Sequence, residues 1–236
     1  MRNHFLRAAA GRDTGIVTSG LVLYLDAGDS NSYPGSGTAW YDLSAEGNNG
    51  TLTGATYSSA DGGSIAFDGA NDYVTISNDI RSDVGEFLAT VSNQFSISTW
   101  FKPDVTDIGR NAIFTKAAGY GSAGNVYLEY SGIRLSAVIR GSATDNFYTS
   151  LTSTWHELAV TWDGTTFKAY VNGSFVSNLS VGTATSQDVA FLLGNSSNLG
   201  EDFEGNISIA LVYDKALTAS EVQKNFDVYK DRYGLS

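Results

Sequence analysis

Cysteine is absent from the 236 residues of the chain, and methionine occurs once, at the first position. The protein therefore has no disulfide bond, no zinc–thiolate centre and no thiol nucleophile. Histidine occurs only at positions 4 and 156, and no motif that presents a catalytic serine lies near either of them. We therefore do not expect a Ser-His-Asp hydrolase.

Basic residues are also scarce, since the chain has 14 lysines and arginines against 25 acidic residues and a formal net charge of −11. A surface that binds nucleic acid phosphates is therefore not expected. Residues 1–12 are the exception, because they contain three arginines and no acid. A basic arm ahead of an acidic body indicates a partner protein, although a short basic terminus can also be simply solvated. The residues expected to contact the partner are Arg2, Phe5, Leu6, Arg7 and Arg12.

Long apolar runs are missing as well. No run approaches the length of a membrane-spanning helix, so we expect no membrane insertion. The N-terminal sequence MRNHFLRAAAGR places Arg7 inside what would be the apolar region of a secretory signal, and that region is far too short. If the protein works outside a cell, we expect it to leave by lysis or by an unconventional route.

The residues that are present favour β-structure. Hydrophobic residues make up 42% of the chain and glycine occurs 26 times, which suits a large core with many tight turns. Short segments of strand character follow one another from Gly20 without helices between them, and we find no repeat or linker. We therefore predict an N-terminal arm (residues 1–19) and one antiparallel two-sheet sandwich (residues 20–236), with a short helix or covering loop at residues 79–93.

The segment WHELAVTWDGTTFKAYVNG, residues 155–173, illustrates the pattern. Its alternation places Leu158, Val160 and Trp162 on one face of a strand. Asn172-Gly173 is typical of a type I′ hairpin turn, because both central residues need positive φ. We therefore predict a β-meander with a scaffold role, in which His156 lies at a strand entrance and Glu157 points to solvent.

The C-terminus has a helical pattern instead. Thr218 and Glu221 form a capping box, and Gly234 is a stop signal. Apolar residues recur at helical spacing between them, at Val222, Phe226, Tyr229 and Tyr233. We predict an amphipathic helix over residues 218–233 that packs against the sandwich.

Three ordered motifs resemble laminin G-like domains of the concanavalin A-like lectin/glucanase superfamily. They are SIAFDGANDYVTI, the meander WHELAVTWDGTTFKAYVNG, and FEGNISIALVYDKALTASEV. The resemblance implies a jelly roll of antiparallel strands. It also implies that one calcium ion near the sheet rim and a carbohydrate-binding site are possible.

A narrower resemblance involves LVLYLDAGDSNSYPGSGTAWYDLSAEGNNGTL and YKDRYGLS. These segments are similar to lectin-like proteins of tailed bacteriophages. The resemblance implies a non-enzymatic virion protein, either a capsid decoration or a fibre component, which is assembled in the host cytoplasm and then exposed outside the cell. The expected partners are other virion proteins, bound through the arm, and further copies of the chain in a homo-oligomer. The alternative is a free-standing carbohydrate-binding module, with or without a dependence on calcium.

Calcium needs six to eight oxygen ligands, which carboxylates in loops supply. Asp68, Asn71 and Asp72 lie in one candidate loop, and Asp26, Asp29 and Asn31 lie in another. We expect a calcium site formed by Asp68, Asn71 and Asp72, with Asp26 as a further candidate ligand. The alternative is an Asx turn without a metal.

Loop aromatics are the candidates for glycan contact. Tyr33, Trp40 and Tyr41 lie in the first long loop, and Tyr120 lies in a later glycine-rich segment. Such aromatics can equally cap the core or meet another subunit. The chain lacks the Glu-x-Asp-x-x-Glu motif of the retaining glucanases in this superfamily, and its acidic cluster GEDFEG reads as a loop. We therefore expect no enzymatic activity.

Overall fold

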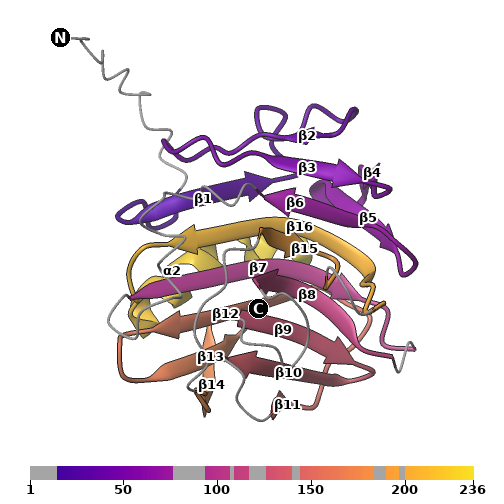
Figure 1. Ribbon diagram of the computed structural model, residues 1–236. Coiled ribbons are helices and arrows are strands. Elements are labelled where there is room, and N and C mark those ends of the chain that lie inside the picture. Colours follow the sequence, from indigo (N-terminus) through magenta and orange to yellow (C-terminus); the bar gives the residue numbers. More distant parts are fainter. Residues whose placement is uncertain are drawn as a thin grey trace, which may run out of the picture.

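The computed structural model describes residues 15–76, 94–106, 109–116, 126–139, 144–182, 190–196 and 200–236. These residues form two antiparallel β-sheets packed face to face, with one short helix near the C-terminus (Figure 1). The all-β prediction is therefore confirmed. The helix or loop expected at residues 79–93 lies outside the described residues.

The first sheet, called sheet A, has the strand order β14-β13-β12-β7-β16-β5-β4, and β1 also pairs with β16. Its strands are β1 (Leu21–Asp26), β4 (Thr56–Ser58), β5 (Ser64–Asp68), β7 (Phe95–Pro103), β12 (His156–Trp162), β13 (Phe167–Val171), β14 (Ser174–Leu179) and β16 (Glu204–Tyr213). A short 3-10 helix, η1 (Ala60–Gly62), connects β4 to β5.

The second sheet, called sheet B, has the order β11-β10-β9-β8-β15-β6-β3-β2. Its strands are β2 (Ala39–Trp40), β3 (Gly50–Thr53), β6 (Tyr73–Ile76), β8 (Asn111–Lys116), β9 (Val126–Ser131), β10 (Arg134–Ile139), β11 (Asp145–Tyr148) and β15 (Phe191–Leu193).

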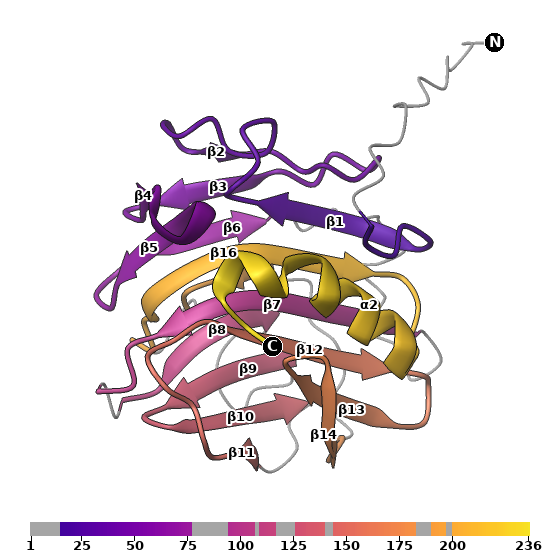
Figure 2. The same cartoon turned by 180° about the vertical axis from the view of Figure 1, so that it is seen from behind.

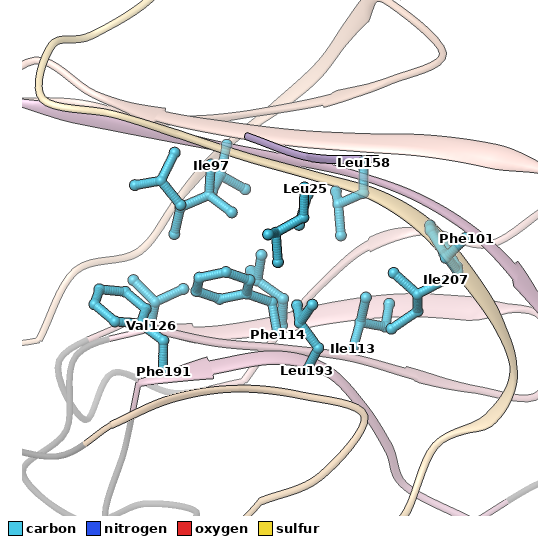
Figure 3. Close-up of a cluster of buried hydrophobic side chains, with 14 of the residues drawn as sticks. Leu25, Ile97, Phe101, Ile113, Phe114, Val126, Leu158, Phe191, Leu193 and Ile207 are labelled. Atoms are coloured by element: carbon cyan, nitrogen blue, oxygen red, sulfur yellow. The ribbon is translucent and has the colours of Figure 1, made fainter. Parts of the chain in front are cut away.

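The core lies between the sheets and follows from the alternation along each strand. In β7, Phe95, Ile97 and Phe101 point into the core, whereas Ser96, Ser98 and Trp100 point outward. Strand β12 pairs with β7 so that Val160 lies opposite Ile97, which places the predicted inner face of the meander in the same core. Figure 3 shows side chains of both sheets meeting there, among them Leu25 and Leu158 from sheet A and Phe114 and Phe191 from sheet B.

The outer face of sheet A is apolar in its middle. The pairing of β16 with β7 shifts between Ile207 and Ile209. Beyond this irregularity, Ile209, Leu211 and Tyr213 face outward with Trp100 of β7. An apolar outer face needs a cover, and the C-terminal helix provides it.

Helix α2 (Ala219–Tyr229) and the 3-10 turn η2 (Lys230–Tyr233) lie across β16 and β7 (Figure 2). Thr218 and Glu221 form both halves of the capping box, and Gly234 ends the segment with a φ of 65°. The four apolar residues of the predicted stripe are buried against the outer face of sheet A. The helix prediction is therefore confirmed. No helix among the described residues has the length and apolarity needed to cross a membrane.

The β13–β14 turn has the expected geometry, with φ of 50° at Asn172 and 73° at Gly173. However, the expectation that Glu157 points to solvent is wrong, because Glu157 has no exposed surface. Its carboxylate accepts hydrogen bonds from the Ser98 hydroxyl, at 2.8 Å, and from the Gly173 N–H, at 3.0 Å. A Cβ atom at Gly173 would lie 3.0 Å from Cδ1 of Phe226, so this turn and α2 together cover the acid.

The packed domain starts earlier than the sequence predicts. Ile16 and Val17, which we assigned to the arm, are buried in the apolar cluster beneath α2. The Val17 N–H donates a 2.8 Å hydrogen bond to Oδ1 of Asn225 in α2. These contacts attach the chain to the domain directly after residue 15.

Candidate ligand-binding site

A surface hollow of ≈ 350 Å³ lies at the end of sheet A where β16 begins. We call it the rim hollow. Its polar lining residues are Lys102, Asp104, Ser153, Glu204 and Asn206, and its apolar ones include Ala66, Phe67 and Pro103. Strand pairing brings them together, because Asn206 of β16 lies opposite both Ala66 of β5 and Lys102 of β7.

Both main-chain polar groups of Glu204 form hydrogen bonds, which fix the position of this acidic residue in the rim hollow. Its carbonyl oxygen accepts hydrogen bonds from the Asp104 N–H, at 3.0 Å, and from the Tyr130 hydroxyl, at 2.6 Å. Its N–H donates to Oδ1 of Asn111, at 3.1 Å. At the next residue, Gly205, a Cβ would lie 2.2 Å from the Lys102 carbonyl oxygen, so the close approach of β16 to β7 requires glycine.

The charges of the rim hollow are set by its neighbours. Lys102 forms an ion pair with Asp61, with 3.4 Å between Nζ and Oδ2. Asp61 also accepts a 2.9 Å hydrogen bond from the Trp155 indole, and this bond is the main cause that lowers the pKa of the Asp61 carboxyl. The N–H and hydroxyl of Thr106 lower the pKa of Asp104. Both carboxylates therefore remain ionised at neutral pH.

Further acids lie beside the rim hollow. Asp68 of β5 lies directly opposite Glu204 of β16 in the strand register. Burial raises the pKa of Asp202, and the charges of Asp68 and Asp72 raise it further. Burial is likewise the main cause that raises the pKa of Asp72. This end of the sandwich therefore has a negative potential.

The expected calcium loop has the hydrogen bonds of a turn. Oδ1 of Asp68 accepts from the Ala70 N–H, at 3.0 Å, as in an Asx turn. Oδ2 of Asp72 accepts from the Asp68 N–H, also at 3.0 Å, and Asn71 is exposed. In the described part of the chain, no group of three or more His, Cys or acidic residues is arranged to hold a metal ion. These hydrogen bonds are those of an Asx turn, and calcium binding by this loop stays a prediction.

Asp26 is not available as a metal ligand, which corrects the expectation for this residue. It is 2% exposed, and its two carboxylate oxygens accept hydrogen bonds from Arg232 at 2.7 and 2.9 Å. Oδ1 also accepts from the Gly28 N–H. The guanidinium thus takes the position that a cation would need, and the ion pair fastens η2 to the end of β1.

Two of the aromatic residues expected to contact glycans are part of the core instead. Trp40 has no exposed surface, and Tyr33 is 4% exposed with its hydroxyl bonded to the Gly37 carbonyl oxygen. These two expectations are therefore wrong. Tyr41 is 47% exposed, and its role stays a prediction. Tyr120 lies outside the described residues, and so do the residues expected to bind a partner, which are Arg2, Phe5, Leu6, Arg7 and Arg12.

A buried ion-pair cluster on the outer face of sheet B was not predicted. Glu129 in β9 is 2% exposed and accepts two hydrogen bonds from Arg110 and one from Ser136. Nε of Arg110 lies 3.3 Å from Oε1 of Glu201. Burial raises the pKa of the Glu201 carboxyl, and the charge of Arg110 offsets part of this shift. The only sequence signal was an acid inside an otherwise apolar strand segment.

A family model described as the concanavalin A-like lectin/glucanases superfamily matches residues 68–223. The chain belongs to this superfamily. The match covers the meander and most of the strands that form the rim hollow, and the two-sheet sandwich agrees with it. No curated protein matches the chain.

Several solved structures share the fold of this lectin-like domain. The binding domain of Paraclostridial Mosquitocidal Protein 1 is 17% identical with a TM-score of 0.69, and the alignment covers 92% of this chain and 55% of that one. A Trypanosoma rangeli sialidase is 16% identical with a TM-score of 0.72, covering 92% and 33%. The binding domain of botulinum neurotoxin serotype D/C is 13% identical with a TM-score of 0.62, covering 88% and 52%. The chain thus spans between a third and just over half of these structures, and the similarity shows the fold alone.

Proposed function

We propose that this lectin-like domain binds carbohydrate and that the rim hollow is the binding site. The observation that carries the proposal is the convergence of an ammonium, two carboxylates, a hydroxyl and a carboxamide around a depression of ≈ 350 Å³. Sugars present many hydroxyl groups, which need both donors and acceptors. The apolar side chains of Ala66 and Pro103 supply a surface for the less polar face of a sugar ring.

The similar structures support a binding function rather than a catalytic one. Two of the similar structures are binding domains of toxins, and a third is a sialidase of which this chain covers a third. Glycoside hydrolysis needs a carboxylic acid whose pKa is raised, whereas the pKa of Asp104 in the rim hollow is lowered. We therefore propose that the domain binds glycans without cleaving them.

A glycan array with the wild-type protein, followed by titration calorimetry on the best ligand, tests the proposal. Asn206→Ala removes a carboxamide from the rim hollow, and Asn178→Ala removes one from an exposed position on β14. Loss of a hydrogen bond costs about 0.5–1.5 kcal/mol net, so Asn206→Ala should weaken binding by about two- to tenfold and Asn178→Ala should not. Equal affinities for both variants, or no binding of any glycan by the wild type, would refute the assignment.

Calcium dependence is part of the same experiment. We keep calcium binding by Asp68, Asn71 and Asp72 as a proposal. Burial is the main cause that raises the pKa of Asp202, and an ion would relieve the repulsion from Asp68 and Asp72 that raises it further. Each titration is therefore repeated with calcium and with a chelator. Higher affinity or a higher melting temperature in calcium would support the site, whereas identical results in both buffers would leave the Asx turn as the complete description.

The whole protein is proposed to be a virion component of a tailed bacteriophage, either a capsid decoration or a fibre protein, assembled as a homo-oligomer. The charge contrast between the basic residues 1–12 and the acidic remainder supports an attachment arm. The anchoring of Ile16 and Val17 beneath α2 supports a fixed point from which the arm extends. Removal of residues 2–14 tests this role.

A further inference from the structure

The rim hollow contains two carboxylates and one ammonium group, and the ammonium is already paired. Asp104 and Glu204 line the hollow. Nζ of Lys102 lies 3.4 Å from the carboxylate of Asp61, which is held in place by Trp155. The cation that lines the hollow is therefore already paired with an acid beside it, which leaves two carboxylates in the lining without a second cation among the described lining residues.

Among the residues that the structure describes, the neighbouring charged groups do not offset this charge. Asp68 lies opposite Glu204 in the strand register, which adds a third acid. The Glu204 side chain lies against Gly69 in the β5–β6 turn. Arg110, the basic residue on the β7–β8 side, is bound to Glu129 and Glu201. Burial and the neighbouring acids raise the pKa of Asp202, as expected where negative potential is not compensated.

We infer that the rim hollow selects glycans bearing free amino groups over neutral glycans and rejects acidic ones. This inference rests on the proposed function, since it names the class of ligand for the same site. An ammonium on a sugar ring would approach Asp104 and Glu204 with favourable charge, whereas a carboxylate-bearing sugar would bring like charges together. The acidic sialic acids are therefore expected to be poor ligands.

The test compares oligomers of equal length composed of glucosamine, N-acetylglucosamine and galacturonic acid, which carry positive, no and negative charge respectively. At low salt the wild type should bind the glucosamine oligomer about fivefold or more tightly than the acetylated one. It should bind the galacturonic acid oligomer weakest. Higher salt should reduce the difference between the first two ligands.

The acidity of the whole protein would also attract cations, so the variants must separate the site from the general charge. Glu204→Gln removes one charge from the rim hollow, and Glu46→Gln removes one from an exposed loop residue that does not line it. Glu204→Gln should weaken glucosamine binding about fivefold and change binding of the acetylated oligomer less than about twofold. Glu46→Gln should change neither.

The outcomes distinguish this inference from the proposed function. Binding of galacturonic acid as tightly as glucosamine overturns the inference while glycan binding stands. Equal effects of the Glu204 and Glu46 variants also overturn it, because the preference would then come from net charge. Binding of none of the three oligomers, together with a negative glycan array, would refute the proposed function itself.

Discussion

At the scale of single residues, Glu157 is the clearest case of a side chain whose environment differs from its sequence pattern. Burial raises the pKa of Glu157 to about 7, although the Gly173 N–H and the Ser98 hydroxyl lower it. The folded state therefore binds the Glu157 proton more tightly than the unfolded state does. The stability from this group is fully present below pH 4.5, its ordinary pKa, and is lost as the pH rises through about 7.

Glu157→Gln should therefore remove part of the pH dependence of stability. The introduced glutamine would keep an acceptor for the Gly173 N–H and could donate to the Ser98 hydroxyl. At pH 8 the variant should be more stable than the wild type by up to about 3 kcal/mol, and at pH 5 the two should be similar. Urea unfolding at both pH values measures the difference. Parallel stability curves for the variant and the wild type, with Glu46→Gln as control, would contradict the assignment.

Residue environments could be predicted only where a local pattern determines them. Alternation correctly placed Leu158, Val160 and Trp162 in the core. It also placed Glu157 on the outer face, but nothing within β12 shows that α2 and a turn cover that face. The same limit applies to Trp40 and Tyr41, which are adjacent in sequence, since one has no exposed surface and the other is 47% exposed.

At the scale of elements, helix α2 is held by burial of its apolar stripe, because an isolated helix of 11 residues is marginal in water. Phe226 is 2% exposed and Lys224 is exposed. Phe226→Ala should reduce the free energy of unfolding by about 3–5 kcal/mol, whereas Lys224→Ala should change it by no more than about 0.5 kcal/mol. Thermal denaturation measures both variants, which introduce the same residue into the same helix.

Equal melting temperatures for these two variants would show that α2 does not pack on sheet A. The comparison also checks the register of the helix, because Phe226 contacts the Asn172–Gly173 turn only in the observed orientation. Far-UV circular dichroism of both variants would confirm that the helix itself is retained.

Long elements with a clear period were predictable, and short ones were not. The sequence pattern predicted the strand that contains Leu158, Val160 and Trp162, which is β12, and the capped start of α2 at Thr218. Strand β2 has two residues and η1 has three, with a φ of 53° at Asp61; neither is long enough to show a period. The rim hollow could not be predicted, because its residues on β5, β7 and β16 meet only through the order and register of sheet A.

At the scale of the whole molecule, two regions have different expected partners. The rim hollow lies where β16 begins, at Glu204. Residues 15–17 are anchored beneath α2, next to the segment that follows the other end of β16. A domain attached through its N-terminus would therefore keep the rim hollow free to bind ligand.

Deletion of residues 2–14 should separate attachment from folding. The contacts of Ile16 and Val17 with α2 remain in the truncated protein, so its melting temperature should stay within about 2 °C of the wild type. Its glycan binding should also be unchanged. Incorporation into particles, measured by quantifying the protein in purified virions, should be lost.

Two substitution sets identify what the arm contributes. Exposed ion pairs contribute only about 0–1 kcal/mol each, so replacing Arg2, Arg7 and Arg12 with glutamine should weaken incorporation and make it less dependent on salt. Replacing Phe5 and Leu6 with alanine should weaken it more, because burial of a large apolar side chain contributes about 1.5–3 kcal/mol. Incorporation of the truncated protein at the wild-type level would show that attachment does not use residues 2–14. The proposed function of the arm would then be wrong, whereas the lectin-like domain and its rim hollow would be unaffected.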